Sequence, residues 1–271
     1  KKNIITDKEI NEFSRIKSIA LKRKLNLLTI DENFIIKSTK IPLIGKFQIK
    51  NLLMSVLASK LSGLSIKKIT STLKYIKSVN GRLELTRVLS NQAKIFIDYA
   101  HTPDALFTVL QSLKKHYNSK VSLVFGCGGE RDKKKRKVMA RIARDFCEKI
   151  YVTDDNPRGE DPKKIRKMIT KELVKGNYIE IGNRAKAIKC AIQNSEPSEI
   201  ILVAGKGHEA TQDYGKKIIK ISDKSIIKSI KFRKFNKEQC NKYFNSKILD
   251  KAINKNKEFK GVSINSKEVK K

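Results

Sequence analysis

The feature that most constrains the fold is a regular alternation of short apolar segments with amphipathic segments, which begins near residue 88. Runs rich in β-branched and aromatic residues predict strands at 94–99, 121–126, 149–154, 178–182 and 199–205. Apolar residues at helical spacing predict helices at 103–117, 135–149, 161–176 and 184–195. This alternation indicates an α/β fold, in which helices cover both faces of a mostly parallel sheet.

Glycines and charged side chains follow four of these predicted strands. The segments are DYAHTPDAL (98–106), GCGGERDKKKR (126–136), DDNPRGEDP (154–162) and GKGHE (205–209). A purely structural loop needs only turn residues, whereas binding residues concentrate on loops like these. Because ligands bind beyond the carboxyl ends of the strands in such sheets, we expect one polar cleft lined by several loops.

The glycine-rich turn after residue 125 lies between a predicted strand and a predicted helix. Such turns let backbone N–H groups approach an anion at a helix N-terminus, and Arg131 and Asp132 lie close by. The turn is neither a GxxxxGK[ST] loop nor a GxGxxG loop. The alternative is a tight turn that precedes a solvated basic helix.

The segment DDNPRGEDP brings a guanidinium, Arg158, onto a loop stiffened by proline. A guanidinium binds a carboxylate through two parallel hydrogen bonds, which suits an amino-acid-like ligand. Asp155 and Asn156 can accept an ammonium or a hydroxyl. Helix capping by Asp161 with Pro162 is the structural alternative, but it leaves 154–158 unexplained.

The segment AGKGHE (204–209) combines two glycines with three polar side chains, Lys206, His208 and Glu209. Histidine has the pKa range for acid–base chemistry. A lone histidine is more often a hydrogen-bonding residue, and this is our interpretation of His208.

The segment DYAHTP (98–103) places Asp98 and His101 directly after a predicted strand. Its structural alternative is a helix start, with Thr102 as the N-cap and Pro103 as the first helical residue.

Residues 1–80 have a different pattern, of mixed structure. We expect helices at 9–24, 51–64 and 65–77, the last capped by Ser65, a strand at 33–45 broken at Pro42, and a hinge at 78–84.

The formal net charge of +34 invites a nucleic-acid-binding interpretation. However, the excess is mostly lysine, is spread along the whole chain, and accompanies abundant Ile and Asn. A nucleic-acid surface concentrates its basic residues on one element, often beside aromatic residues. We therefore favour a coding bias toward AT-rich codons, although polyanionic ligands will be attracted in either case.

Four cysteines, Cys127, Cys147, Cys190 and Cys240, are widely spaced and form no CxxC pair. This argues against a zinc site or a disulfide scaffold and fits a reducing compartment. No apolar run is long enough to span a bilayer, so we expect a cytoplasmic protein.

Six segments in this order resemble the Mur ligases of peptidoglycan synthesis, and among them the members that add meso-diaminopimelate. They are GKFQIKNLL (45–53), NGRLE (80–84), DYAHTPDAL, VFGCGGERDKKKR (124–136), VTDDNPR (152–158) and LVAGKGHE (202–209). Gln48 and Glu130 depart from the residues usual in that family. The resemblance covers roughly residues 33–232 and implies that the alternating region is a Rossmann-like C-terminal domain.

The resemblance implies a pocket for the far amino-acid end of meso-diaminopimelate. In that family the DNPR motif accompanies a preference for diaminopimelate over lysine. The implied residues are Arg131, Asp155, Asn156, Pro157, Arg158, Gly205 and Glu209.

The resemblance also implies a nucleotide site and a reaction. Asn51, Arg82, Asp98 and His101 would contact ATP. The reaction is an ATP-dependent amide ligation, in which an acyl phosphate of UDP-N-acetylmuramoyl-L-alanyl-D-glutamate is attacked by the diaminopimelate amine. Mg²⁺ would stabilise the phosphoryl charge.

Several parts of that machinery do not occur in this sequence. It has no GTxGKT phosphate loop, and we expect neither catalytic residues nor metal ligands within it. The first residue is Lys1, so we interpret the chain as part of a longer ligase that is inactive alone. We expect 1–86 to be the end of a central ATP-binding domain, 87–234 the C-terminal domain, and 235–271 a tail.

The tail has two interpretations. It resembles the opening of a further Mur ligase, which would be a fusion to the D-alanyl-D-alanine-adding enzyme, or it is a lysine-rich disordered segment. For the whole chain, the alternatives to an enzyme are a basic module that binds nucleotides or nucleic acids without ligase activity, and a decayed remnant.

Overall fold

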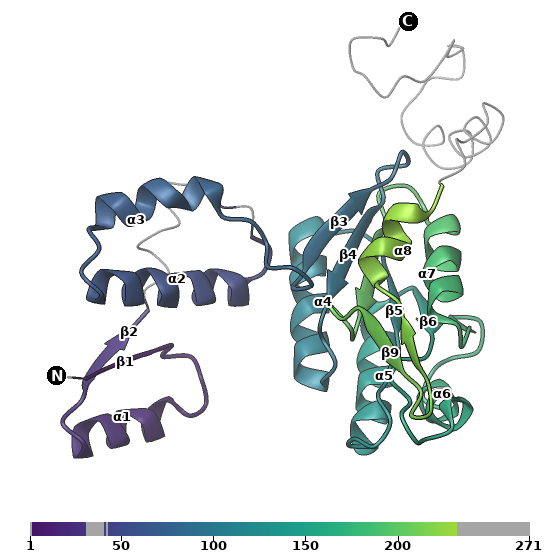
Figure 1. The fold of residues 1–271 in the computed structure, drawn as a ribbon, viewed down its shortest axis with the longest axis horizontal. Coiled ribbons are helices and arrows are strands. Elements are labelled where there is room, and N and C mark those ends of the chain that lie inside the picture. Colours follow the sequence, from purple (N-terminus) through teal and green to yellow (C-terminus); the bar gives the residue numbers. More distant parts are fainter. Residues whose placement is uncertain (1, 31–40, 42, 232–271) are drawn as a thin grey trace, which may run out of the picture. The chain divides into compact units, whose positions relative to one another are not determined.

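The computed structural model describes residues 2–30, 41 and 43–231 of the chain (Figure 1). It divides into two units, Lys1–Ile230 and Lys231–Lys271. Nearly all of the second unit lies outside the described residues, and so do the predicted tail and most of the predicted strand at 33–45.

Residues 3–29 form a β–α–β unit. Strands β1 (Asn3–Thr6) and β2 (Asn26–Thr29) pair in parallel, and helix α1 (Phe13–Lys22) connects them. The helix confirms the predicted one but is shorter, whereas the two strands were not predicted. Each contributes only four residues, too few for a period-2 pattern to be recognised.

Two further helices follow, α2 (Lys46–Leu61) and α3 (Ile66–Thr72), and α3 continues into a 3₁₀ turn, η2 (Leu73–Tyr75). The hydroxyl of Ser65 accepts a hydrogen bond from the amide of Lys68, as predicted for an N-cap. A small apolar cluster joins these elements through Leu53, Val56, Ile69 and Leu73.

The central sheet has the strand order β3-β4-β8-β5-β6-β7. The strands are β3 (Glu84–Val88), β4 (Lys94–Asp98), β5 (Val121–Phe125), β6 (Lys149–Val152), β7 (Tyr178–Glu180) and β8 (Ile200–Ala204). All neighbours pair in parallel except β3 and β4. The predicted parallel sheet is therefore confirmed. Strand β3 was not predicted, and it begins at the last residue of the predicted hinge, 78–84.

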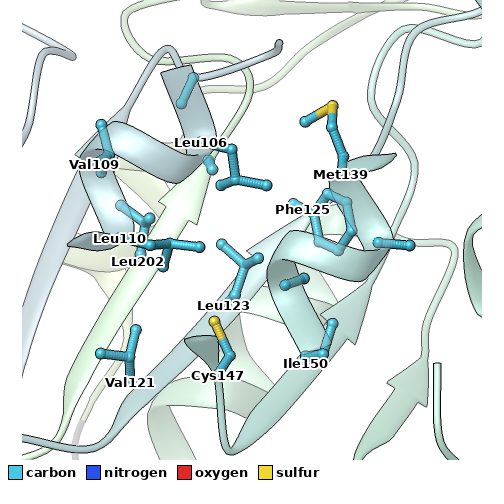
Figure 2. Packing of buried hydrophobic residues seen from close by; sticks show 14 of the residues in the cluster. Leu106, Val109, Leu110, Val121, Leu123, Phe125, Met139, Cys147, Ile150 and Leu202 are labelled. Carbon is cyan, nitrogen blue, oxygen red and sulfur yellow. The ribbon is translucent and has the colours of Figure 1, made fainter. Parts of the chain in front are cut away.

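Helices α4 (Pro103–Tyr117), α5 (Lys134–Phe146) and α6 (Pro162–Thr170) cover one face of the sheet. Their buried residues share one apolar cluster with alternate residues of the strands, such as Leu123 and Phe125. Figure 2 shows this packing, in which Leu106, Leu110 and Met139 meet strand residues that are fully buried. Burying each such side chain contributes about 1.5–3 kcal/mol.

The opposite face is covered by α7 (Arg184–Gln193) and α8 (Asp223–Ser229). The intervening strand residues Val124, Ile201 and Val203 are fully buried but lie outside the first cluster. Helix α7 packs against β5, β6 and β8, and α8 packs against α7. The helices predicted after the first four strands are confirmed, whereas α8 was not predicted.

The strand order determines which loops are neighbours. Strand β8 lies between β4 and β5, and β6 lies beyond β5. The turn after β8 (205–209) is therefore flanked by the loops that follow β4 and β5, and the loop after β6 follows next along the same edge. A short hairpin, β9 (Thr211–Asp213) with β10 (Ile218–Lys220), continues from the central turn.

A buried ion pair fastens α8 to the start of α7. The Arg184 guanidinium donates to both oxygens of Asp223, at 2.8 and 2.7 Å, and to the carbonyl of Ala204 at 3.0 Å. Both charged side chains are almost completely buried. Removing one partner of such a pair leaves an uncompensated charge in the interior.

We therefore expect Asp223→Ala to lower the free energy of unfolding by about 3–5 kcal/mol in urea titrations, because Arg184 would be left buried and unpaired. The matched control is Asp145→Ala, since Asp145 is 58% exposed and pairs with Arg144 at 3.0 Å. The control should lose less than about 1 kcal/mol. Equal losses in the two variants would contradict this account.

Candidate functional site

The glycine-rich turn and the DNPR loop are in direct backbone contact. The amide of Gly129 donates to the carbonyl of Asn156 at 2.9 Å. A Cβ atom at Gly129 would lie 1.8 Å from the carbonyl oxygen of Pro157. Glycine is therefore required here by the close approach of the second loop, and Pro157 is buried against it.

A buried arginine holds these two loops together. Arg136, which is fully buried, donates to the carbonyl of Gly128 at 3.1 Å and to both oxygens of Glu160, at 2.9 and 3.0 Å. Glu160 also accepts the amide of Glu130 at 2.6 Å. The hydrogen bonds from Arg136 are the main reason that the pKa of Glu160 falls to about 2.

These contacts change the interpretation of the glycine-rich turn. Its amides at Gly129 and Glu130 are already bonded to protein oxygens, so at these two positions the turn is not an open anion cradle. Asp132 accepts the amide of Lys134 at 2.8 Å, directly before α5. This part of the turn therefore fits the alternative interpretation, in which it is a tight turn that precedes a basic helix.

Arg158 lies in a strained but well-supported position. Its backbone has φ +51°, which is unusual for a residue other than glycine. Its amide donates to the carbonyl of Asp213 at 3.0 Å, and its guanidinium Nη1 donates to the carbonyl of Gly129 at 2.9 Å. Nε lies 3.9 Å from the carboxylate of Asp213, and within the described structure Nη2 makes no hydrogen bond, so this part of the guanidinium fork can bind a ligand.

Arg131 lies on the glycine-rich turn and is exposed. A Cβ atom at Gly128 would lie 3.1 Å from Nη1 of Arg158 and 3.8 Å from Cγ of Arg131. The two arginines predicted to hold carboxylates therefore both lie beside Gly128, although they come from different loops.

The two aspartates of the DNPR loop have different surroundings. Asp154 accepts hydrogen bonds from Arg166 and, at 2.9 Å, from the hydroxyl of Tyr214, so it is a structural residue beneath the loop. Asp155 caps the amide of Asn156 at 2.7 Å through Oδ1. Its Oδ2 lies 2.7 Å from the position that a Cβ atom at Gly205 would occupy.

Asn156 connects the DNPR loop to the turn after β8. Its Nδ2 donates to Glu209 at 3.0 Å, and its Oδ1 accepts from the ammonium of Lys206 at 3.0 Å and from the amide of Asp213 at 3.0 Å. Lys206 also pairs with Glu209 at 2.7 Å. Gly205, with φ +109°, makes the turn that brings these groups together.

The residues predicted to contact a nucleotide gather around Tyr99. The guanidinium of Arg82 lies 4.3 Å from the centre of the Tyr99 ring, and the ring of His101 meets that of Tyr99 edge-on at 4.6 Å. His101 is exposed and bonds the carbonyl of Tyr99 at 2.9 Å. An exposed imidazole next to a stacked guanidinium can bind a phosphate or a planar base.

Asp98 is different, because its carboxylate is occupied by the backbone. Its oxygens accept the amides of Leu83 at 2.6 Å and Ala100 at 2.7 Å. Burial raises the pKa of Asp98, against the opposing effect of these two hydrogen bonds and of Arg82. The geometry supports a positioning role, in which Asp98 fixes the turn that carries Arg82.

Asn51, the remaining candidate, lies on the exposed side of α2. Its carbonyl accepts the hydroxyl of Ser55 at 2.9 Å, and no contact is seen between its side chain and the other candidates in the described part of the chain.

No group of three His, Cys, Asp or Glu side chains that could hold a metal ion occurs among the residues that the structure describes. None of the described helices is long and apolar enough to cross a membrane.

Comparison with known proteins identifies relatives of this chain. Residues 81–207 match the family described as "Mur ligase, glutamate ligase domain". The chain is 46% identical over 189 residues to the UDP-N-acetylmuramoyl-L-alanyl-D-glutamate--2,6-diaminopimelate ligase of Rickettsia montanensis, and 40% identical over 246 residues to that of Rickettsia bellii. The chain belongs to the Mur ligase family.

The relatives are much longer than this Mur ligase chain. The two alignments cover 69% and 82% of the chain but only 39% and 51% of the Rickettsia proteins. A solved structure of a UDP-N-acetylmuramoyl-L-alanyl-D-glutamate--2,6-diaminopimelate ligase superposes with a TM-score of 0.56 at 28% identity, and covers 84% of this chain and 52% of that one. The chain thus spans about half the length of its relatives.

Sequence reasoning missed several residues that shape the site of this Mur ligase chain. Gln212 is buried and donates to the carbonyls of Asp154 at 3.1 Å and Asp155 at 2.6 Å. It lies on β9, a strand of three residues that gives no detectable pattern. Arg136 lies in a run of basic residues, and only the structure distinguishes it from its exposed neighbours.

The Arg136–Glu160 pair predicts a pH-dependent stability. Because the pKa of Glu160 is about 2 in the folded chain and 4.5 in its ordinary state, its contribution is present above about pH 4.5 and is lost as the pH falls toward 2. Glu160→Gln should lower the unfolding free energy at pH 7 by about 1–3 kcal/mol.

The difference between Glu160→Gln and the unmodified chain should shrink between pH 4.5 and pH 3, as measured by urea unfolding across that range. Glutamine is the matched replacement, since it keeps the shape and an acceptor oxygen but cannot ionise. A difference that stays constant over this range would contradict the proposed linkage.

Proposed function

We propose that this chain provides the amino-acid site, and part of the nucleotide site, of a ligase that joins meso-diaminopimelate to UDP-N-acetylmuramoyl-L-alanyl-D-glutamate. The observation that carries the proposal is the convergence of Arg131, Arg158, Asn156 and Glu209 at one edge of the sheet. The relatives named as diaminopimelate ligases support it.

The charged side chains of the pocket suit a ligand that carries both the carboxylate and the ammonium of an amino acid. Arg131 and Arg158 offer guanidinium groups to carboxylates, and the carboxylate of Glu209 offers a partner for an ammonium. Lysine lacks the distal carboxylate that diaminopimelate carries. A site that leaves a guanidinium partly buried without its carboxylate disfavours lysine, because unpaired buried charges are costly.

The conformation of Arg158 supports this role. Its side chain is 26% exposed, so that it is accessible to a ligand but partly shielded from water. The hydrogen bond from its amide to the carbonyl of Asp213, and those from Nη1 to the carbonyls of Gly129 and Asn156, hold it in place before a ligand arrives. A preformed guanidinium loses less conformational entropy on binding than a free one.

For the nucleotide we propose ATP, contacted by Arg82, His101 and Asn51, with Asp98 as a positioning residue. The stacked pair of Arg82 and Tyr99 beside the exposed His101 supports this assignment. ATP supplies the phosphoryl group that activates the glutamyl carboxylate. No cluster suited to a metal occurs in the described part of the chain, so we place the Mg²⁺ ligands outside these residues.

The reaction assigns clear tasks to the residues of this chain. The two arginines and Glu209 orient the diaminopimelate so that its reacting amine faces the acyl phosphate, which is catalysis by positioning.

We further propose that 1–86 is the end of the ATP-binding domain, that 87–234 is the C-terminal domain, and that the enzyme acts in the cytoplasm. The six-stranded sheet begins at Glu84, three residues before that boundary, so β3 spans it. The fusion hypothesis for 235–271 concerns residues outside the described structure.

The proposal is tested by titration calorimetry of the chain with meso-diaminopimelate and with L-lysine. The unmodified chain should bind meso-diaminopimelate more tightly. Arg158→Ala should weaken that binding roughly 10- to 100-fold, since a charged hydrogen bond contributes about 1.5–3 kcal/mol. It should not weaken the binding of lysine, because it removes the guanidinium that disfavours lysine.

The matched control is Arg144→Ala, because Arg144 is an exposed arginine of α5 that pairs only with its neighbour Asp145 among the described residues. It should not change either affinity. If Arg158→Ala weakened both ligands equally, or if the unmodified chain did not distinguish them, the assignment of the pocket would be wrong.

The competing function is a nucleotide- or nucleic-acid-binding module, which the net charge of +34 and the glycine-rich turns favour. The occupied amides of the glycine-rich turn weaken its other support. We expect binding of the chain to duplex DNA to be undetectable at 150 mM salt in a filter-binding assay. Tight binding that decreases steeply with salt would favour the nucleic-acid function instead.

A further inference from the structure

Lys206 is a buried cation at the centre of the pocket edge. Its side chain is 1% exposed, and it follows β8, the strand that lies between β4 and β5. Its ammonium donates to Glu209 Oε2 at 2.7 Å and to Asn156 Oδ1 at 3.0 Å. Burying an ammonium costs several kcal/mol unless it is well paired, so a lysine here calls for an explanation beyond packing.

The ammonium determines the orientation of the Asn156 amide. Oδ1 receives two donors, Lys206 and the amide of Asp213, and Nδ2 faces Glu209 at 3.0 Å. The reversed amide would place its NH₂ group against two donors and its oxygen against a carboxylate. The network therefore permits only one orientation of a side chain that is otherwise nearly symmetrical.

The same ammonium keeps Glu209 in its charged form. Burial opposes ionisation of Glu209, but hydrogen bonds from Lys206, Asn156 and Tyr99 outweigh it and lower the pKa of the carboxyl. The guanidinium of Arg184 interacts with it electrostatically from the start of α7. The Glu209 side chain is 30% exposed, so it is accessible to a ligand, whereas the Lys206 side chain is not.

We propose that Lys206 is a positioning residue of the amino-acid pocket, which prepares the Glu209 carboxylate and the Asn156 amide for the ammonium end of the ligand. It acts through these two side chains and does not touch the ligand itself. The proposal rests on the proposed function only in naming meso-diaminopimelate as that ligand.

The first test needs no ligand. A ¹³C NMR titration of the Glu209 side-chain carboxyl should give a pKa below 4.5 in the unmodified chain and a higher one in Lys206→Met, which keeps the length of the side chain but removes its charge. The control is Lys216→Met, an exposed lysine in the turn between β9 and β10, which should leave that pKa unchanged. An ordinary or raised pKa in the unmodified chain would overturn the proposal, even if Lys206→Met did not fold.

The second test measures binding. Lys206→Met should weaken meso-diaminopimelate roughly 10- to 100-fold at pH 7, and the loss should increase as the pH falls to 5.5, because Glu209 becomes protonated. The unmodified chain should show little change over this range. Unchanged affinity and an unchanged pH profile in a folded Lys206→Met variant would overturn the proposal.

The two tests separate this proposal from the function on which it rests. If the unmodified chain bound no meso-diaminopimelate, the proposed function would fail, while the NMR titration would still decide whether Lys206 controls Glu209. If binding occurred but Lys206→Met left Glu209 unaffected, only the role of Lys206 would be wrong.

Discussion

The parallel pairing of β4, β8, β5 and β6 is the constraint on which the rest of the structure depends. Parallel strands bring their carboxyl ends to the same edge, and the order of these four strands places the turn 205–209 between the loops that carry Asp98 and Arg131. Each candidate side chain of the amino-acid pocket comes from a loop at this edge. No single loop holds a complete set of charges.

Charged pairs that are wholly or partly buried then hold the loops at this edge of the sheet together. Arg136 with Glu160, Arg184 with Asp223 and Lys206 with Glu209 each join segments that are distant in sequence or define a tight turn. Buried pairs are weak sources of net stability, but breaking one is costly, so they favour a single arrangement of the loops. These charged pairs thus fix the geometry of the loops that carry the proposed amino-acid pocket.

The alternation of strands and helices was sufficient to predict the central sheet, because the central strands β5 and β8 are buried throughout and helices such as α5 have a distinct apolar side. Strands β1, β2, β9 and β10 were missed, because each has only three or four residues and lies outside the regular alternation that revealed the equally short β6 and β7. Strand β3 was missed because the alternation was recognised only from about residue 88 and the predicted hinge ended at residue 84.

The candidate site was predictable to a similar extent. Motifs at strand ends identified Arg158, Asn156 and Glu209 as neighbours, and the structure brings these loops together. The buried partners that orient them, Arg136 and Gln212, could not be predicted, because an arginine in a basic run or a glutamine after a turn looks like a surface residue. The hydrogen bonds that Asp98 accepts from two backbone amides likewise could not be predicted from the sequence.

The most direct test of the central claim is a crystal structure of the chain with meso-diaminopimelate bound. The account predicts a carboxylate of the ligand on the free side of the Arg158 guanidinium, with the adjacent ammonium facing Glu209 and the loops in their present arrangement. A ligand bound elsewhere, or bound with its carboxylates away from both Arg131 and Arg158, would contradict the assignment of this edge as the amino-acid pocket.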